Sequence, residues 1–289
     1  MSVVRYHTAT IDGLDVFYRE AGDPSNPTVL LLHGFPSSSH MFRNLIVSLA
    51  DSYHLVAPDH IGFGRSSIPT IHEFNYSFDN LTAITEKLIA RIGLERFAIY
   101  IHDYGAPIGL RIASAVPERI TAIIAQSGNA YLDGFTPFWD ILFAHAKDRA
   151  ANERGVREYF TASKTYWQYT HGVPADRLGL IAPEAWLLDQ AGLDRKGNDE
   201  IQLQLFWDYQ FNLDEYPKFQ EYFRTHQPPL LVAWGRNDEI FGVAGAEAFR
   251  RDLPHGQFQL LDAGHFALET HGEEISGYIR QFLGQLTRY

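Results

Sequence analysis

Hydrophobic residues gather in short runs along the first third of the chain. Residues 29–32, 54–57 and 97–101 form three such runs and are almost entirely apolar. Runs of this kind are typical of strands that are buried on both faces of a parallel sheet. Between them, residues 41–50 and 80–92 carry apolar side chains at helical spacing. This alternation of strand and helix predicts a doubly wound, mostly parallel α/β sheet.

The alternation stops after one more strand, expected over residues 120–125 and preceded by a helix that ends before Pro117. Residues 129–226 show helical but no strand-like patterning. This stretch is rich in tyrosine and holds four of the five tryptophans, namely Trp139, Trp167, Trp186 and Trp207. We predict a helical insertion here, within a domain formed by residues 1–128 and 227–289. A continuation of the sheet with poorly visible strands is the weaker alternative.

The last part of the chain returns to the first pattern. Strands are expected over residues 229–234 and 258–261, and helices over residues 244–252 and 273–286. The sequence contains no internal repeat and no low-complexity segment. One domain interrupted by one insertion is therefore the simplest organisation for 289 residues.

Composition excludes several classes of function. The formal net charge of −11 disfavours nucleic acids and anionic membranes as partners, because both would repel this chain. The absence of cysteine excludes disulfides, thiolate zinc sites and a cysteine nucleophile. No apolar run has the form of a signal peptide or the length of a membrane span. We expect a cytoplasmic enzyme or binding protein, either a monomer or a homodimer.

The clearest candidate for chemistry is Asp103. It follows the strand expected over residues 97–101, and Gly105 comes two positions later, before a helix. A nucleophile elbow has this context, with a small residue that relieves crowding in a strained turn. Aspartate is also a common helix N-cap, so the turn alone leaves both interpretations open.

Two more polar residues follow predicted strands late in the chain. Asp238 lies in the segment WGRND and His265 in the segment DAGH. Open α/β sheets present their active sites at such strand ends. A lone aspartate there is usually a turn residue, and a lone histidine is usually structural. The order of Asp103, Asp238 and His265, however, matches the nucleophile, acid and base of α/β hydrolases.

A fourth segment, HGFP at residues 33–36, follows the first apolar run. Its turn can bring the backbone N–H of Phe35 beside that of Tyr104, and two such donors would form an oxyanion hole. The alternative is a plain turn, since glycine and proline are common in loops.

Taken in order, the segments LLLHGFP, APDHIGFGRSS, IHDYGAPIGLRIA, WGRNDEIF and DAGHFALE resemble the epoxide hydrolase and haloalkane dehalogenase branch of the α/β-hydrolase superfamily. The resemblance covers nearly the whole catalytic domain and is looser in the insertion. It implies a helical cap that roofs an apolar pocket over the nucleophile. We expect that pocket to be lined by Phe35, Tyr104, Trp139, Trp207 and Phe266. Neither a cofactor nor a metal is expected.

An aspartate nucleophile narrows the reaction. Its carboxylate is ionised at neutral pH and can attack without a base. Attack on an ester or amide would give a labile anhydride, whereas attack on an electrophilic sp3 carbon gives an ordinary alkyl ester. Water activated by His265 could then hydrolyse the ester, with Asp238 orienting the imidazole. Epoxides and alkyl halides are the chief carbon electrophiles of this kind.

The leaving group separates these two substrates. The resemblance implies that a dehalogenase would offer N–H donors to the halide, and neither Tyr104 nor Phe35 has one in its side chain. Epoxide hydrolases use cap tyrosines, and Tyr209 stands where that family has its second. The stretch expected to carry the first, residues 138–143, has no tyrosine. Tyrosines of neighbouring helices that could replace it are Tyr159, Tyr166 and Tyr169.

We therefore expect a hydrolase that opens a small or medium apolar epoxide to a diol. The first alternative is a haloalkane dehalogenase, with Trp139 or Trp207 as the halide donor. The second, from another class, is a protein of this fold that binds ligands without turnover. The complete set of Asp103, Asp238 and His265 disfavours that second alternative.

Overall fold

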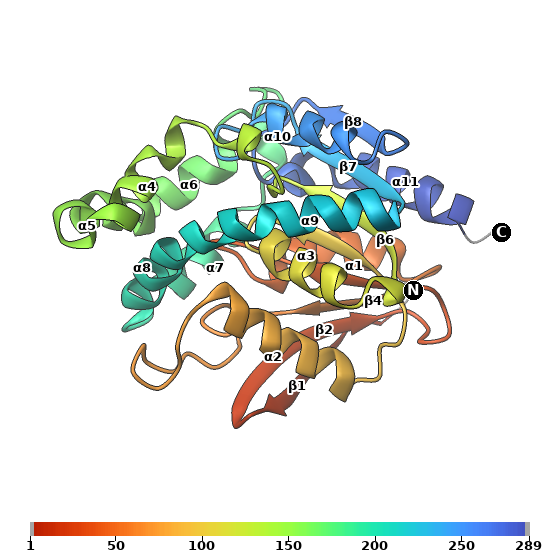
Figure 1. The fold of residues 1–289 in the computed structure, drawn as a ribbon, viewed down its shortest axis with the longest axis horizontal. Helices are drawn as coiled ribbons and strands as arrows, with labels where there is room; N and C mark the ends of the chain where they lie inside the picture. The colour runs from red at the N-terminus through yellow and green to blue at the C-terminus, as the bar shows by residue number, and fades with distance from the viewer. Residues whose placement is uncertain (1–2, 287–289) are drawn as a thin grey trace.

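The computed structural model describes residues 3–286, which fold around an eight-stranded sheet (Figure 1). The strand order is β1-β2-β4-β3-β5-β6-β7-β8. Strands β3 to β8 run parallel, and β1 and β2 are antiparallel to their neighbours. The predicted mostly parallel, doubly wound sheet is therefore confirmed. The strands are β1 (Arg5–Ile11), β2 (Leu14–Ala21), β3 (Thr28–Leu32), β4 (His54–Pro58), β5 (Phe97–His102), β6 (Ile120–Gln126), β7 (Leu230–Gly235) and β8 (Gln257–Leu261).

The hairpin of β1 and β2 is the part of the sheet that the hydrophobic runs did not predict. Its strands pair in antiparallel register from Arg5 with Glu20 to Ile11 with Leu14. The turn between them is Asp12-Gly13, and both residues have positive φ, 50° and 81°. An Asp-Gly pair at positive φ is typical of a tight type I′ hairpin turn. That dipeptide is a signal from which the hairpin could have been found.

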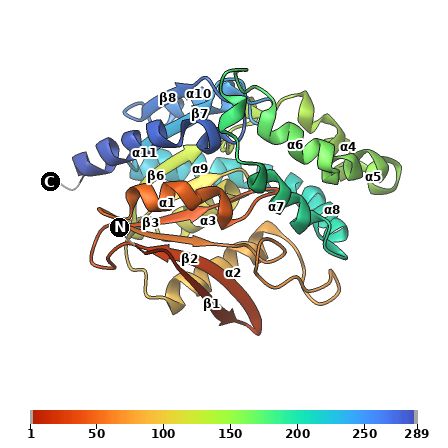
Figure 2. The same ribbon diagram turned by 180° about the vertical axis from the view of Figure 1, so that it is seen from behind.

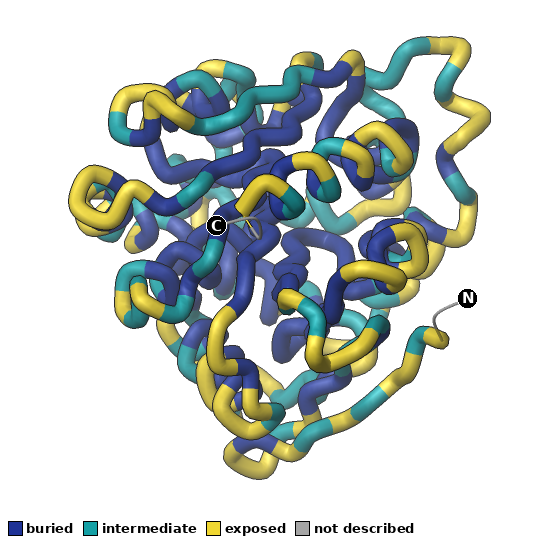
Figure 3. The backbone as a smooth tube through the Cα atoms, turned by 90° about the vertical axis from the view of Figure 1, so that its right-hand side faces the viewer, coloured by how far each residue is buried: buried dark blue, intermediate teal, exposed yellow. Residues whose placement is uncertain are grey.

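Helices cover both faces of the sheet. In Figure 1, α2, α3 and α9 lie in front, and Figure 2 shows α1 and α11 on the opposite side. Alternate residues of one strand enter different apolar cores: Leu30 and Leu32 pack in one, Val29 and Leu31 in the other. Figure 3 shows this buried backbone at the centre of the molecule. The helices named are α1 (Arg43–Leu49), α2 (Phe78–Arg91), α3 (Gly105–Ala115), α9 (Asn212–His226) and α11 (Ala267–Leu286).

Three predicted helices differ at their ends. Residues 41–50 form a 3-10 turn followed by α1, and residues 244–252 form α10 (Val243–Ala248) followed by another 3-10 turn. The last helix begins at Ala267 rather than residue 273, and it continues through a kink at His271. Within the described residues, no helix is both long and apolar enough to cross a membrane.

Residues 129–226 contain none of the eight strands of the sheet, and the structure describes them throughout. An isolated bridge joins Phe135 of this stretch to Phe241, just after β7. In Figure 1 the helices α4 to α8 stand together at one end of the sheet, and α9 returns alongside α3. The bounds of these helices are α4 (Asp140–Lys147), α5 (Arg149–Arg157), α6 (Ala162–Thr170), α7 (Pro183–Leu193) and α8 (Asn198–Asp208).

Candidate active site

Asp103 occupies a strained turn between β5 and α3. Its φ is 51°, a conformation that costs energy for any residue with a Cβ atom. Gly105 makes the turn possible, because a Cβ atom there would lie 2.1 Å from the carbonyl oxygen of Leu32. Tyr104, not Asp103, holds the N-cap position of α3, and no side chain caps the helix. The turn therefore has the geometry of a nucleophile elbow rather than that of an aspartate N-cap.

Two backbone amides bind the same oxygen of this carboxylate. The N–H groups of Phe35 and Tyr104 both donate to Asp103 Oδ1, each over 2.6 Å. The preceding Gly34 permits this approach, since a Cβ atom there would lie 2.1 Å from Asp103 Oδ1. The predicted pair of donors is thus assembled around one oxygen, and Oδ2 makes neither of these two bonds.

His265 and Asp238 form a buried pair in the next loops. His265 Nδ1 lies 3.0 Å from Asp238 Oδ2, and both side chains are almost completely buried. The backbone N–H groups of Ile240 and Phe241 donate to the other oxygen, Asp238 Oδ1, over 2.7 and 3.1 Å. These bonds fix the carboxylate and with it the imidazole. His265 Nε2 is buried and has no hydrogen-bond partner among residues 3–286.

Burial and neighbouring charges shift the pKa values of Asp103 and His265. Burial raises the pKa of Asp103 to about 6, against the opposing charge of His265 and the two amide hydrogen bonds. For His265, burial favours the neutral imidazole, but the charge and hydrogen bond of Asp238, with the charge of Asp103, outweigh it. The pKa of His265 is therefore raised above its ordinary value. The protonated imidazole of His265 and the carboxylate of Asp103 therefore stabilise each other.

Aromatic rings surround the candidate nucleophile. Tyr104 packs against Tyr209 and Phe206, with ring centroids 6.1 Å apart in both pairs. Phe206 also lies 4.9 Å from Phe35, and Trp139 lies 4.4 Å from Tyr209. All five side chains are buried. The structure therefore brings Tyr209, Trp139, Phe35 and Tyr104 together, as expected, and adds Phe206.

Trp207 does not belong to this group of rings, contrary to expectation. Its ring packs against Phe211, which is 44% exposed, and under the guanidinium of Arg149 at 5.0 Å. The reason is helical geometry, because adjacent residues of α8 point about 100° apart. Phe206 faces inward and Trp207 faces outward.

Phe266 lies beside the pair formed by His265 and Asp238. Its ring is 4.9 Å from the His265 ring and stacks on Tyr169 at 4.0 Å. The His102 ring lies 4.6 Å from that of His265, and burial lowers the pKa of His102 well below its ordinary value. Among residues 3–286, no group of three or more His, Asp or Glu side chains is placed to hold a metal ion.

This geometry agrees with what a comparison of sequences finds. A family model described as alpha/beta hydrolase fold matches residues 27–272. The chain belongs to the α/β-hydrolase family. This hydrolase is 46% identical to an uncharacterized hydrolase of Saccharomyces cerevisiae over 93% of either chain. It is 25% identical to a haloalkane dehalogenase of Mycolicibacterium paratuberculosis over 91% of this chain and 85% of that one.

Solved structures share the fold at lower identity. The hydrolase superposes on the epoxide hydrolase CorEH with a TM-score of 0.78 at 17% identity, over 98% of this chain and all of the other. A likeness at this identity concerns the fold alone. The predicted α/β-hydrolase fold and the resemblance to this branch of the superfamily are confirmed.

None of the three tyrosines considered as partners of Tyr209 offers a buried hydroxyl without a hydrogen-bond partner. Tyr159 donates to the carbonyl oxygen of Phe138 over 3.1 Å, and Tyr169 donates to Asp189 over 2.5 Å. Tyr166 is 49% exposed. The tyrosine hydroxyls nearest to Tyr209 belong instead to other elements of the hydrolase.

Tyr104 and Tyr216 are these neighbours. The hydroxyls of Tyr104, Tyr209 and Tyr216 are buried, and none makes a hydrogen bond of standard geometry with residues 3–286. Burial raises the pKa of Tyr209 well above its ordinary value, and Tyr216, Asp103 and Tyr104 raise it further. The protonated hydroxyls of Tyr104 and Tyr209 therefore lie close enough to Asp103 to be influenced by its charge, and Tyr216 is a neighbour of Tyr209. Tyr216 was not singled out from the sequence, because α9 carries no motif that marks it.

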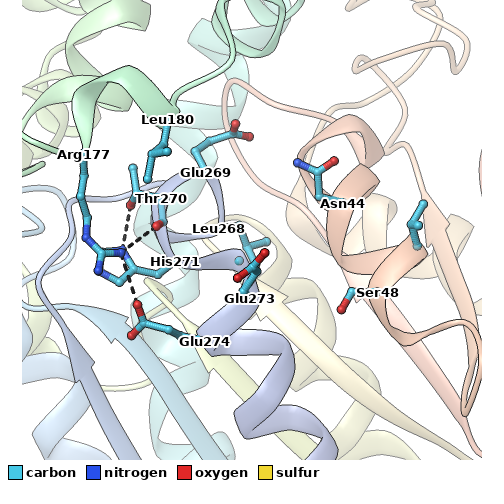
Figure 4. A pocket seen from close by; sticks show the side chains of 12 residues that line it. Asn44, Ser48, Arg177, Leu180, Leu268, Glu269, Thr270, His271, Glu273 and Glu274 are labelled. Carbon is cyan, nitrogen blue, oxygen red and sulfur yellow. Dashed lines mark hydrogen bonds and ion pairs between the residues drawn. The ribbon is translucent and has the colours of Figure 1, made fainter.

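A separate hollow of about 770 Å³ is lined by other residues (Figure 4). It is bounded by α1, by α11 and by Arg177 and Leu180 of the insertion. Arg177 donates to the Thr270 carbonyl over 3.0 Å and contacts Glu274 at 3.3 Å. None of Asp103, Asp238 and His265 lines this hollow, so it is not the candidate active site.

Proposed function

We propose that this hydrolase opens an apolar epoxide to a diol through a covalent ester on Asp103. The observation that carries the proposal is the environment of the Asp103 carboxylate. Oδ1 accepts two backbone N–H groups over 2.6 Å, and the buried His265–Asp238 pair stands beside it. A binding protein has no need of this set, whereas a two-step hydrolysis uses every member of it.

In the first step, Asp103 Oδ2 attacks a ring carbon of the epoxide. A bond forms between Oδ2 and carbon, the ring C–O bond breaks, and the departing oxygen takes a proton. The amides of Phe35 and Tyr104 hold Oδ1, so the free oxygen is the one that reacts. A pKa of about 6 leaves Asp103 ionised at neutral pH, and the incomplete hydration of a buried carboxylate favours attack.

In the second step, water hydrolyses the ester at the Asp103 carboxyl carbon. His265 Nε2 takes one proton from the water, and the oxyanion on Oδ1 is stabilised by the Phe35 and Tyr104 amides. The bond between Oδ2 and the carboxyl carbon breaks, so the diol leaves with Oδ2 and with the second proton of the water. The proton that His265 gains makes up for the one that the protein gave to the departing oxygen in the first step, so the total number of protons on the hydrolase is restored. Asp238 stabilises the imidazolium meanwhile.

The donors available for the leaving group favour an epoxide over a halide. We propose that Tyr209 protonates the departing alkoxide, because its hydroxyl is buried, protonated and influenced by the charge of Asp103. The indole N–H of Trp139, by contrast, donates to the Ile240 carbonyl over 2.7 Å. Trp207 packs on the outer side of α8. Both indoles proposed above as halide donors are thus engaged elsewhere.

We also propose that residues 129–226 act as a cap over the site. Support comes from Phe206 and Tyr209, which reach Phe35 and Tyr104 of the catalytic domain from α8 and its end. The side chains that meet there are mostly aromatic rings. A small or medium apolar epoxide suits such a space, and water would be largely excluded from it.

The test is the intact mass of a His265→Gln variant after exposure to styrene oxide and, separately, to a bromoalkane. Without its base the hydrolase should stall as the ester. A mass gain equal to the whole epoxide, absent from the Asp103→Asn variant, supports the proposal. A gain equal to the bromoalkane minus bromide, with the epoxide inert, would assign the hydrolase to dehalogenation. Ligand-induced thermal stabilisation without any adduct or turnover would indicate a binding protein.

A further inference from the structure

A second cavity lies at the boundary between the catalytic domain and the helical insertion. Its volume is about 340 Å³. The catalytic domain contributes residues 36–38 from the turn after Phe35, together with Asp59 and neighbouring residues. The insertion contributes the end of α7 around Asp189 and the loop that follows it. Neither Asp103 nor His265 lines it, so this cavity is separate from the candidate active site.

Three arginines line this cavity: Arg19 from β2, Arg65 from the loop after β4, and Arg195 from the loop after α7. Within residues 3–286, none of them forms a salt bridge with a carboxylate. Arg19 donates to the Ser39 hydroxyl over 3.0 Å, and the Arg65 guanidinium lies over the Phe17 ring at 5.6 Å. Three cations around one small cavity are unexpected in a chain of net charge −11.

Arg195 joins the insertion to the catalytic domain. Its guanidinium donates to the carbonyl oxygens of Gly64 and Gly62 over 2.9 and 3.2 Å, and to that of Gly192 over 3.1 Å. These bonds use three of the five N–H groups of an arginine. The remaining two are available to a ligand, while the geometry of the guanidinium is fixed. Burial lowers the pKa of Arg195 and of Arg19, as expected for cations that are partly removed from water.

The carboxylates of the cavity offset these cations only in part, since the charge of Asp59 acts on Arg19 and Arg195 but forms no salt bridge with either. Asp59 turns both oxygens to the backbone, accepting from the N–H of Ser39 and of Arg65 over 2.7 Å each. Asp189 accepts the Tyr169 hydroxyl, and burial raises the pKa of Asp189 to about 7. Three positive charges therefore face at most two negative ones, and fewer whenever Asp189 is protonated.

We propose that this cavity binds a small oxyanion, a carboxylate or a phosphate, between Arg19, Arg65 and Arg195. Guanidinium groups bind both kinds of oxyanion through paired N–H donors. The hydroxyl of Ser38, which also lines the cavity, adds a further hydrogen-bond donor. Because Arg195 belongs to the insertion and the other two arginines do not, a bound anion holds the two parts together.

The first test is a titration with sodium phosphate at constant ionic strength, with sodium chloride as the balance and Tm as the readout. A ligand that binds only the folded hydrolase raises Tm in a saturable manner. We expect this rise in the wild-type protein, with one phosphate per chain by calorimetry. Arg65→Gln and Arg195→Gln should each weaken phosphate binding by about tenfold or more. This test does not depend on the proposed reaction.

The matched control is Arg154→Gln, which removes an exposed arginine of α5 outside the cavity. It should bind phosphate like the wild type. An equal rise of Tm in Arg65→Gln, or none beyond that of sodium chloride, would overturn the proposal. If Arg195→Gln does not fold, Arg65→Gln decides alone, since its side chain is exposed and makes no salt bridge.

A second arm, which rests on the proposed opening of epoxides, distinguishes a free anion from the anionic end of a substrate. It compares kcat/KM for a pair of epoxides that differ only by a terminal carboxylate. A preference for the carboxylate that disappears in Arg65→Gln assigns the site to the substrate. No preference, together with phosphate binding, assigns it to a separate anion.

Discussion

The strand-end turns and the helical insertion hold the candidate site in different ways. In the turns, backbone groups position the carboxylates: two N–H groups donate to Asp103 Oδ1, and two others donate to Asp238 Oδ1. In the insertion, only side chains reach the site, as rings of α8 and of the segments beside it. A backbone N–H donor remains when its own side chain is replaced, whereas an aromatic contact is lost when the ring is replaced. The comparison suggests that the turns set the chemistry and the insertion sets the substrate.

The largest expected effect follows from a change in the turns. Asp103→Asn should reduce turnover on the order of 10⁴-fold or more, because the neutral carboxamide of asparagine cannot attack the substrate to form the ester. The same variant should be more stable than the wild type at neutral pH. Burial raises the pKa of Asp103 from 3.8 to about 6, so its ionised form destabilises the folded state by about 1–3 kcal/mol.

The size of this stability effect depends on pH. A carboxyl with a raised pKa favours folding below its unfolded pKa and loses that contribution as pH rises through about 6. The advantage of Asp103→Asn should therefore be complete above about pH 6, shrink as the pH falls below 6 and vanish near pH 4, as measured by urea unfolding. An advantage that stayed constant across this range would contradict the buried-charge account.

The next effect concerns the insertion. Tyr209→Phe should slow alkylation by an epoxide by about 10²–10³-fold, the usual worth of a general acid, and leave bromide displacement nearly unchanged. Tyr166→Phe is the matched control, because Tyr166 is half-exposed and packs on Trp186. Single-turnover quench kinetics would measure both. Equal losses with the two substrates would remove Tyr209 from the mechanism.

A smaller effect comes from pH. The alkylation rate should fall about tenfold per pH unit below about 6, because protonated Asp103 is not a nucleophile. In His265→Gln the inflection should move to higher pH, since the charge of His265 lowers the pKa of Asp103. An inflection near the ordinary aspartate value in both proteins would contradict the shifted pKa.

The smallest effect separates two neighbours on α8. Phe206→Leu should raise KM for an aromatic epoxide several-fold, because the ring contacts Phe35 and Tyr104. Trp207→Leu should change KM less than about twofold, since its ring packs on the outer side. Steady-state kinetics of the two variants would measure this difference. A larger rise of KM in Trp207→Leu than in Phe206→Leu would contradict the proposed position of the pocket.

The turns could be predicted from the sequence because each rule there is local. Short apolar runs mark the strands, and Asp103, Asp238 and His265 lie in the turns that follow three of them. The Asp12-Gly13 turn carries an equally local signal that the apolar runs alone do not register. These features depend on a few neighbouring residues and on the backbone geometry of short strands and tight turns.

The insertion was less predictable, because its roles depend on which way each ring points. Trp207 and Phe206 are adjacent and both aromatic, so composition cannot say which one faces Phe35. The N–H of Trp139 is committed to Ile240, a residue far away in the chain. The proximity of Tyr216 to Tyr209 arises from packing of α9. Such contacts are fixed by the tertiary structure and leave no local pattern.

The most direct test of the covalent account is a single turnover of an epoxide in ¹⁸O-labelled water, with the hydrolase in excess. If Asp103 forms the ester, the diol takes its oxygen from Asp103 and emerges unlabelled. The ¹⁸O should then appear in the Asp103 peptide, as detected by mass spectrometry. A labelled diol with an unlabelled Asp103 peptide would mean that water attacks the epoxide directly, which would contradict the account.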